Sequence, residues 1–548
     1  MNLSSPFRVL VLVVSLVHAA EIQRKGDLHI VNKVIAPDGF ERSTVLSNGE
    51  FPGTVITANK GDILEINVFD ELTDTNMALP TTVHWHGIHA KGTRFDDGTA
   101  SVTQCPIVPG NSYNYRVDTA GQTGTYWYHS HYTAQYCDGL RGALIIYDPN
   151  DPHKDLYDVD DTSTIISIAD CCQRLQVSYV PHWQLLPMIT SDLQLPPHVS
   201  LDTFAPTWQG PVQPDSTLIN GQGRYPGGPQ QALAIINVEQ GKRYRFRVIS
   251  MVCDPRFDFS IDGHSMAIIE ADGVNHDPVT VDKFTIFAGQ RYSAVVNADQ
   301  PVGNYWIRAN PYAPGTPGFD GGINSAILRY KGAPDADPTS SEKGDAKVLQ
   351  ETDLHPTENP GAPGEPVQDG ADVNINMLLT LDQDTGRFFI NGKSMEFPDV
   401  PVMLQIMSGV TNPSEIMPIG SVYELPLNKT IQLSFPTEDG SQAAPHPYHL
   451  HGHSFDVVRS AGSSTYNYVN PPRRDVVNIG TPGDNVTIRF RTDNTGPWIM
   501  HCHIALHQEA GLAVVMAEDI AGIQQDQNPP AAWNSLCPAY EEFLGNTD

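Results

Sequence analysis

A pattern repeated three times along this 548-residue chain constrains its fold more than any other feature. Each copy has a glycine and an alternating strand, followed by a second glycine and an aromatic strand. The copies begin at Gly110, Gly289 and Gly483, and their paired glycines lie 14, 14 and 13 residues apart. An earlier part of each unit also aligns, as TVHWHGIH (82–89), FSIDGHSM (259–266) and YHLHGHSF (448–455). Because internal repeats mark repeated structural units, we expect three related β domains.

Short alternating runs of apolar and polar residues support this expectation. DILEINVFD and KRYRFRVIS are typical of strands, with Gly, Pro, Asn and Asp between such runs. Regular turn signals over several hundred residues favour an all-β fold of repeated sandwiches or barrels. We expect domains at residues 21–150, 151–332 and 373–548. Residues 333–372, rich in Pro, Gly and acidic side chains, are expected to form a long surface segment that connects the last two.

The N-terminus predicts secretion. One Arg precedes an apolar run from Val9 to Val17, and small residues follow at Ala19 and Ala20, as at a signal-peptide cleavage site. The alternative is a membrane anchor, but the run is far shorter than the ~20 apolar residues that a span needs. Residues 1–20 are therefore expected to be a signal peptide, and no membrane association is expected.

The charge balance argues against two classes of partner. Lys and Arg number 33 against 63 Asp and Glu, so the net charge is −30. An acidic surface repels nucleic acid and anionic membranes, and suits small neutral or cationic partners. Secretion also permits disulfides among the seven cysteines. It permits glycosylation at Asn428 and Asn485, each of which begins an N-x-T sequence.

Four H-x-H pairs predict metal binding. Residues i and i+2 of a strand face the same way, so each pair aims two imidazoles at one spot. The middle repeat has Ser260 and Asp262, then Arg308 and Asn310, where the outer repeats have histidines. A lone pair is weak evidence, but four at matched places are not a coincidence. The pairs are His84/His86, His129/His131, His449/His451 and His501/His503.

The segment WIMHCHIALH (498–507) narrows the choice of metal. Imidazoles alone suit Zn, Cu, Fe or Ni. Cys502 lies between two histidines on a strand, so its thiolate faces the opposite side and binds a different ion. His446 and His507, the latter expected on a loop, complete a His₂Cys set typical of blue copper. Structural zinc is the alternative, but zinc would want a fourth protein ligand, and Leu512 in the axial position cannot ligate.

These segments resemble the four copper-binding motifs of the multicopper oxidases, and most closely those of fungal laccases. The resemblance covers nearly the whole chain after the signal peptide, including QYCDGLRGALIIYDPNDP, LINGQGR, GNYWIRANP and HPYHLHGHSF. It implies three cupredoxin-like domains of Greek-key β-sandwich or barrel form. It also implies a copper-dependent oxidoreductase that binds four copper ions, one of type 1, one of type 2 and two of type 3.

The resemblance assigns the ligands residue by residue, and it places the trinuclear cluster between the first and third domains. The implied ligands are His446, Cys502 and His507 for type 1; His84 and His449 for type 2; His86, His129 and His503 for one type 3 ion; and His131, His451 and His501 for the other. Small phenols would give single electrons at the type 1 site, and the cluster would reduce O₂ to water. Lignin phenols, pigment precursors and host defence phenols are all compatible substrates.

Two carboxylates have implied roles in this chemistry. Asp97 matches an acid that delivers protons near the type 2 copper; alternatively it is a turn residue before Gly98. Asp215 matches the acid that accepts the phenol proton; alternatively it is a solvated loop residue. The resemblance further implies a monomer with two disulfides, Cys105–Cys537 and Cys137–Cys253.

The chain departs from the family pattern in three places. Ala505 stands where an acid is common, so another carboxylate would have to supply protons. Cys171 and Cys172 replace the usual Trp-Tyr and are expected to be free thiols. Residues 173–213 follow no family pattern; they are either an insertion near the substrate mouth or an artefact of how the coding sequence was joined.

Two rival functions share these motifs. A ferroxidase would need extra carboxylates near the type 1 histidines to take Fe²⁺. Asp215 is one candidate, and the sequence shows no clear second. A non-catalytic copper carrier would take up copper without consuming O₂, and it would not need a trinuclear ligand set.

Overall fold

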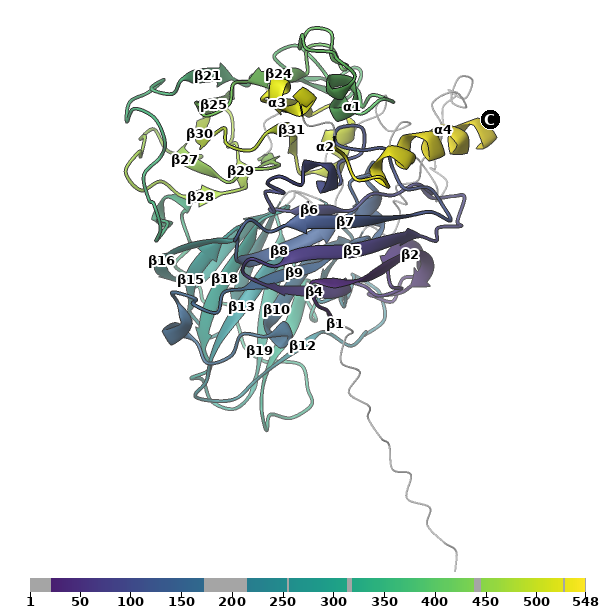
Figure 1. Cartoon of the computed structure of the whole chain (residues 1–548). Helices are drawn as coiled ribbons and strands as arrows, with labels where there is room; N and C mark the ends of the chain where they lie inside the picture. The colour runs from purple at the N-terminus through teal and green to yellow at the C-terminus, as the bar shows by residue number, and fades with distance from the viewer. Residues whose placement is uncertain are drawn as a thin grey trace, which may run out of the picture.

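The computed structural model describes residues 21–171, 214–253, 256–312, 318–437, 445–525 and 528–547. In Figure 1, strands dominate this part of the chain and follow one another as purple-blue, teal and yellow-green bodies. The two segments singled out as strands in the sequence form β5 (Ile63–Asp70) and β13 (Arg243–Ser250). The expected all-β fold with three cupredoxin-like domains is confirmed.

The first domain packs two sheets face to face. Along β5, buried and half-buried side chains alternate without a break, so Leu64, Ile66 and Val68 all point into the core. Its five-stranded sheet contains, in spatial order, β1 (Glu21–Ile22), β4 (Gly53–Asn59), β9 (Arg141–Tyr147), β8 (Gly124–His129) and β6 (His84–His86). Its four-stranded sheet contains β3 (Arg42–Ser47), β2 (Lys25–Ile35), β5 and β7 (Ser112–Asp118).

The second domain has a six-stranded and a five-stranded sheet. The first contains β11 (Ser216–Ile219), β10 (Ile165–Cys171), β13, β18 (Arg291–Asn297), β15 (Met266–Ala271) and β16 (Val274–Val281). The second contains β12 (Ile235–Val238), β20 (Ser325–Tyr330), β19 (Asn304–Pro311), β14 (Arg256–Ile261) and β17 (Lys283–Phe287). Cys171 ends β10, whereas Cys172 and residues 173–213 lie outside the described residues.

The third domain has two five-stranded sheets and a hairpin. The first sheet contains β21 (Val373–Asn376), β25 (Thr430–Pro436), β30 (Asn485–Arg491), β27 (Phe455–Arg459) and β28 (Arg473–Arg474). The second contains β24 (Val422–Leu425), β32 (Ala513–Glu518), β31 (Gly496–Cys502), β26 (Pro447–Leu450) and β29 (Val476–Asn478). The hairpin pairs β22 (Leu379–Asp382) with β23 (Arg387–Ile390).

Helices are few and short among the described residues, and none is long and apolar enough to cross a membrane. The α-helices are α1 (Val402–Met407), α2 (Ala505–Glu509), α3 (Ile520–Gln525) and α4 (Leu536–Thr547). The 3-10 turns are η1 (Arg94–Asp96), η2 (Gln135–Asp138), η3 (Lys154–Leu156), η4 (Thr162–Thr164), η8 (Glu351–Asp353) and η9 (Trp533–Ser535).

The first and third domains are joined more closely than their distance in the sequence suggests. Their buried apolar side chains form one continuous cluster, whereas the core of the second domain is separate. The C-terminal helix α4 lies on the side of the first domain (Figure 1), where Tyr540 meets Tyr132 and the indole of Trp533 donates to the carbonyl of Thr103. The disulfide Cys105–Cys537 closes this contact.

The predicted repeat is also visible in the strand register. His84 pairs with His129 across β6 and β8, and His449 pairs with His501 across β26 and β31. At the equivalent place in the middle domain, Ser260 pairs with Arg308 across β14 and β19. The outer copies therefore place imidazoles where the middle copy places other polar side chains.

An ion pair fills that place in the middle domain. The guanidinium of Arg308 donates to both carboxylate oxygens of Asp262, at 2.7 and 2.8 Å, and both side chains are buried. Asp262 aligns with the second histidine of the outer H-x-H pairs. At this place the middle domain thus pairs its own polar groups where the outer domains present imidazoles.

Candidate metal centre

Eleven buried histidine and cysteine side chains gather into four groups in the structure. The ligand atoms within each group lie within 4.8 Å of one another. The groups are His446/Cys502/His507, His84/His86/His449, His86/His129/His503 and His131/His451/His501. Every residue that the sequence analysis named as a ligand therefore belongs to at least one group.

The first group contains the cysteine. The Sγ atom of Cys502 lies 3.5 Å from Nδ1 of His446 and 3.7 Å from Nδ1 of His507. The two Nδ1 atoms are 3.0 Å apart. His507 lies on the short helix α2, so the expectation of a loop is wrong. One helical turn after Cys502 brings the imidazole back to the thiol's side of the strand.

Leu512 is fully buried and follows this group in the chain. Its carbonyl accepts the backbone N–H of Cys502 at 3.0 Å, and its own N–H donates to the carbonyl of His507 at 2.9 Å. The backbone of Leu512 is thus hydrogen-bonded to the backbones of Cys502 and His507, two members of the group. This fixes the leucine beside the site, in agreement with an axial position.

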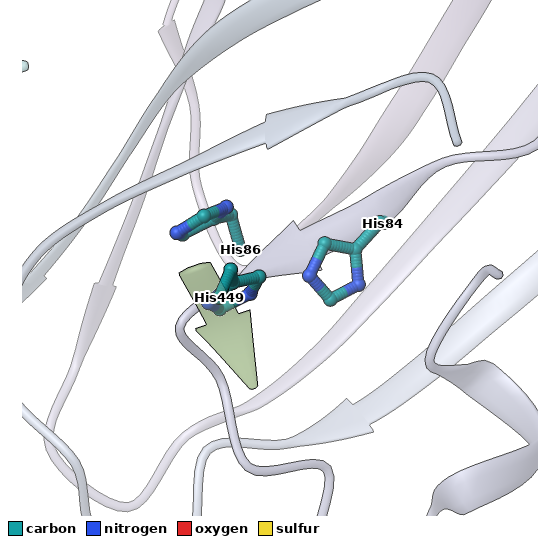
Figure 2. A group of neighbouring side chains, drawn as sticks. All are labelled: His84, His86 and His449. Atoms are coloured by element: carbon teal, nitrogen blue, oxygen red, sulfur yellow. The ribbon is translucent and has the colours of Figure 1, made fainter. Parts of the chain in front are cut away.

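The other three groups combine histidines of the first and third domains. Figure 2 shows His84 and His86 on one strand facing His449, which comes from another. The rings of His86 and His449 stack at 3.8 Å, and so do those of His84 and His451. The site is therefore built across the interface whose apolar core the two domains share.

Three of the four H-x-H pairs divide their imidazoles between groups, whereas His84 and His86 share one group. His129 and His131 belong to different groups, as do His501 and His503. The expectation that a pair aims at one spot is therefore too simple. Only β6 contains both members of its pair, while β8, β26 and β31 end before the second histidine, so the backbone changes direction between the rings.

The hydrogen bonding of the imidazoles fits a metal at each group. Nε2 of His84, His129 and His449 is buried and has no hydrogen-bond partner. The Nδ1 atoms of the same rings face the backbone carbonyls of Asp97, Ser130 and Asp475 at 2.7–2.8 Å. A carbonyl that accepts the N–H of one ring nitrogen fixes the tautomer. The lone pair of the other ring nitrogen is then available to bind a cation.

Several ring nitrogens also face one another directly. Nε2 of His451 lies 3.3 Å from Nε2 of His501, and Nδ1 of His86 lies 3.2 Å from Nε2 of His503. Two neutral imidazoles that each point a lone pair at the other repel, whereas a cation between them would be attracted to both. The donor set and its geometry therefore fit soft or borderline metals such as copper.

Protonation favours the same conclusion. Burial, followed by the charges of neighbouring rings, holds seven imidazole pKa values well below their usual range, so these rings are neutral and able to ligate. The seven are His86, His129, His131, His449, His451, His503 and His507. Burial raises the pKa of the Cys502 thiol, so the thiolate needs a nearby cation.

Comparisons with known proteins agree with this geometry. Three family models described as multicopper oxidase match residues 29–151, 197–333 and 396–522. Laccase-4 of Trametes villosa is 52% identical over 523 residues, which cover 95% of each chain. Laccase-2 of Pleurotus ostreatus is 50% identical, covering 98% of this chain and 97% of its own.

This chain belongs to the multicopper oxidases, as a fungal laccase. The laccase of Botrytis aclada has a similar structure, with a TM-score of 0.78 and 29% identity over 96% of this chain and 93% of its own. Fet3p, described as a multicopper oxidase that functions in iron import, has a TM-score of 0.77. It covers 95% of each chain at 24% identity, so the likeness shows only a shared fold. As a laccase, the protein is a copper-dependent oxidoreductase with four copper ions.

The carboxylates of the laccase lie in different surroundings. Asp97 is buried against the histidines; its carboxylate lies 3.0 Å from Nδ1 of His451 and accepts the hydroxyl of Thr99 at 2.6 Å. Asp215 is half-buried directly before β11. Ala505 is buried on α2 and packs in a mainly apolar cluster with Trp127, so no carboxylate stands at that position.

A second buried acid, Asp475, was not foreseen from the sequence. Its carboxylate lies 3.4 Å from Nε2 of His86, and its backbone carbonyl faces Nδ1 of His449. It belongs to none of the repeated segments and has no characteristic spacing from the histidines. The two arginines before it are no signal either, because Arg473 pairs with Asp456 and Arg474 with Asp272.

The cysteines follow the family pairing. Disulfides join Cys105 to Cys537 and Cys137 to Cys253, and Cys502 is a buried free cysteine. Both predicted disulfides are confirmed. Of the two glycosylation candidates, Asn428 is exposed, whereas Asn485 is half-buried at the start of β30.

Proposed function

We propose that this laccase oxidises small phenols at a type 1 site and reduces O₂ at a trinuclear site, with the ligand sets implied by its motifs. The observation that carries this proposal is the position of Cys502. Its sulfur belongs to one group, while His501 and His503, the residues joined to Cys502 by peptide bonds, place their imidazoles in two others. A single dipeptide step therefore connects the mononuclear group to the trinuclear one.

The protein's own residues have distinct tasks in this scheme. When bound, copper would supply the one-electron acceptor for phenols and the electrons for O₂. The buried histidines exclude water and stay neutral, and the carbonyls of Asp97 and Asp475 hold two of the rings in one orientation. The carboxylate of Asp97 is placed to pass protons to the trinuclear site, since it lies among the rings and is hydrogen-bonded to Thr99.

Asp215 is proposed to accept the proton that a phenol releases on oxidation. The side chain is half-buried directly before β11 and therefore partly accessible, which supports contact with a small substrate. The ferroxidase alternative would need a second acid beside the type 1 histidines. The described residues around His446 and His507 include the aromatic ring of Phe388 and no such acid pair among the metal-binding groups.

The proposal extends to processing and organisation. We propose that residues 1–20 are removed on secretion, and that the mature protein is an extracellular monomer with glycans at Asn428 and Asn485. We propose domain limits of 21–150, 151–332 and 373–548, with 333–372 as the connecting segment. The strands of each described body fall between these limits, which supports the division.

The decisive test replaces the sulfur. Purified protein should be blue, hold four copper ions per chain and consume O₂ with 2,6-dimethoxyphenol. Cys502→Ser should lose the blue absorption and phenol oxidation but keep its circular dichroism, because serine is nearly isosteric. A blue Cys502→Ser protein would refute the type 1 assignment. Copper uptake without O₂ consumption would favour a carrier, and a higher kcat/KM for Fe²⁺ than for the phenol would favour a ferroxidase.

A further inference from the structure

Among the described residues, the middle domain supplies no histidine to the metal groups, yet one of its turns lies directly against them. This turn, residues 288–290 between β17 and β18, contains Gly289 with φ +84°. A Cβ atom on Gly289 would lie 2.9 Å from Cδ2 of His503 and 3.0 Å from Cε1 of His86. The equivalent glycines of the outer repeats, Gly110 and Gly483, have no such neighbour within 4 Å. The middle repeat has therefore adapted this turn to contact two imidazoles.

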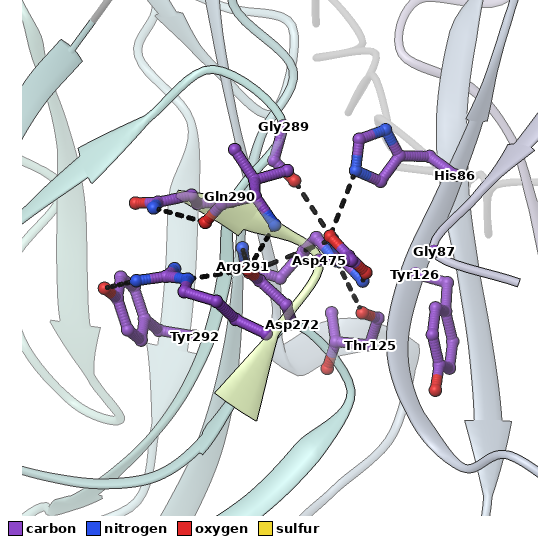
Figure 3. A network of polar contacts seen from close by, with 12 residues as sticks. His86, Gly87, Thr125, Tyr126, Asp272, Gly289, Gln290, Arg291, Tyr292 and Asp475 are labelled. Atoms are coloured by element: carbon purple, nitrogen blue, oxygen red, sulfur yellow. Dashed lines mark hydrogen bonds and ion pairs between the residues drawn. The ribbon is translucent and has the colours of Figure 1, made fainter. Parts of the chain in front are cut away.

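Arg291 follows the turn and connects all three domains. Its side chain is fully buried, and Figure 3 shows it between Thr125 and Asp475. It donates to the carbonyl of Thr125 in the first domain at 2.9 Å. It donates to both carboxylate oxygens of Asp475 in the third domain, at 2.6 and 2.7 Å. Beside it, the amide of Gln290 donates to the carbonyl of Val476 at 3.0 Å.

Asp475 carries this contact to the imidazoles. The carboxylate that Arg291 grips lies 3.4 Å from Nε2 of His86 (Figure 3), and the carbonyl of the same residue is 2.8 Å from Nδ1 of His449. His86 and His449 are themselves stacked, with 12° between their rings. Asp475 thus contacts both rings of the stacked pair between the domains, and Arg291 in turn holds Asp475.

The ion pair between Arg291 and Asp475 is tightly packed against Gly87. A Cβ atom on Gly87 would lie 2.4 Å from Nη2 of Arg291 and 2.6 Å from Oδ2 of Asp475. Only glycine after His86 therefore lets the guanidinium and the carboxylate meet in a flat, two-bond arrangement. Lysine has one ammonium group and cannot reproduce that geometry.

We propose that Arg291 and Asp475 are positioning residues of the trinuclear centre, through which the middle domain sets the ring orientations of His86 and His449. The proposal rests on the proposed assignment of these histidines as ligands. Outer partners of this kind typically change metal affinity or activity by about 10–100-fold when they are removed.

Arg291→Lys tests the proposal, and Arg308→Lys is its matched control. Arg308 also forms a buried two-bond ion pair in the middle domain, with Asp262, but it contacts none of the metal groups. Both variants should lose thermal stability. Only Arg291→Lys should lose type 2 copper, by about 10-fold or more in affinity, with a changed type 2 electron paramagnetic resonance spectrum and weaker near-ultraviolet absorption of the type 3 pair. The blue absorption should persist in both.

The outcomes separate this proposal from the function on which it rests. Native type 2 and type 3 spectra in Arg291→Lys, with stability lost as in Arg308→Lys, would overturn the positioning role. Wild-type protein without these spectra would instead refute the ligand assignment. If Arg291→Lys does not fold, Asp475→Asn serves in its place, because it keeps the size and the backbone carbonyl. It should disturb the spectra through His86, and a native spectrum would overturn the proposal.

Discussion

Asp97 and Asp475 hold histidines of the metal-binding groups in the same way from opposite domains. The backbone carbonyl of Asp97 faces Nδ1 of His84, and its carboxylate faces Nδ1 of His451 in the third domain. The backbone carbonyl of Asp475 faces Nδ1 of His449, and its carboxylate faces Nε2 of His86 in the first domain. Each acid therefore orients one ring of its own domain and one of the other.

The two acids differ in the second hydrogen-bonding partner of the carboxylate, besides the histidine. Asp475 is locked by the guanidinium of Arg291, whereas Asp97 accepts a hydroxyl from Thr99. Within the described residues, the ion-pair partners of Asp97 are histidines only. Because a hydroxyl can exchange protons and a paired guanidinium cannot, the proposed proton role suits Asp97 better than Asp475.

Asp97→Asn should slow O₂ reduction without affecting electron entry. We expect kcat to fall by about 10²–10⁴-fold, the usual loss for a positioned acid. Anaerobic stopped-flow bleaching of the blue absorption by a phenol should keep its wild-type rate, while reoxidation by O₂ should slow. Thr99→Ser keeps the hydroxyl and is the control. Equal slowing of both half-reactions would argue against a proton role.

Leu512→Met should lower the type 1 reduction potential. Leucine donates nothing to copper and keeps water out, whereas a thioether donates electron density and stabilises Cu(II). The substitution nearly conserves volume, so it should cost less than about 1.5 kcal/mol of stability at this buried site. Redox titration of the blue absorption measures the effect, and poorly reducing phenols should turn over more slowly. An unchanged potential at full copper content would show that hydrogen bonds to the Cys502 sulfur govern it instead.

Asp215→Asn should distinguish substrates that release a proton from those that do not. KM for phenols should rise and their pH optimum should move upward, because the asparagine amide cannot accept the phenolic proton. A non-phenolic electron donor should be oxidised as before. Steady-state kinetics on both donors across pH provides the check. Similar losses on the two donors would indicate that Asp215 has a structural role.

Asp70→Asn should stabilise the protein at neutral and alkaline pH. The carboxyl is buried; Oδ1 accepts the N–H of Leu72, and Oδ2 has no hydrogen-bond partner. Burial raises the pKa of Asp70 to about 8. The unfolded chain, with a pKa of about 3.9, binds fewer protons than the folded one between these values, so stability falls as pH rises through this window.

Asparagine removes that dependence because it is neutral at every pH. We expect the variant to be more stable by roughly 1–3 kcal/mol at pH 8 and to differ little from wild type near pH 4. Thermal unfolding across pH measures this, with the exposed Asp345→Asn as the control. A constant difference between Asp70→Asn and wild type at all pH values would contradict the explanation.

Features that are local or repeated in sequence were predictable. The glycine spacing predicted the three domains, and the alternation of apolar and polar residues predicted strands β5 and β13. The H-x-H pairs predicted which histidines gather into metal-binding groups. Strand geometry also separated Cys502 from its neighbours. These predictions succeed because each depends on residues a few positions apart, whose relation the backbone sets directly.

Features that depend on distant segments were not predictable. Arg291 and Asp475 are 184 residues apart and meet only after three domains have packed. The repeat placed Asp262 and Arg308 opposite the histidines, but alignment alone could not show that they pair with each other. The helix that carries His507 was missed because its five residues are too short for a helical period to appear.

The disulfide Cys105–Cys537 closes a loop of 432 residues around the whole molecule. It ties the end of the third domain to the first, whose histidines join those of the third domain in three of the metal-binding groups. If copper is lost and the interface opens, the two halves of the site cannot diffuse apart. The effective concentration of one half of the site near the other stays high. The rate of reassembly therefore depends on the supply of copper and not on slow diffusion of the two domains toward each other. The disulfide therefore keeps the first and third domains of the apoprotein close to the arrangement that binds copper.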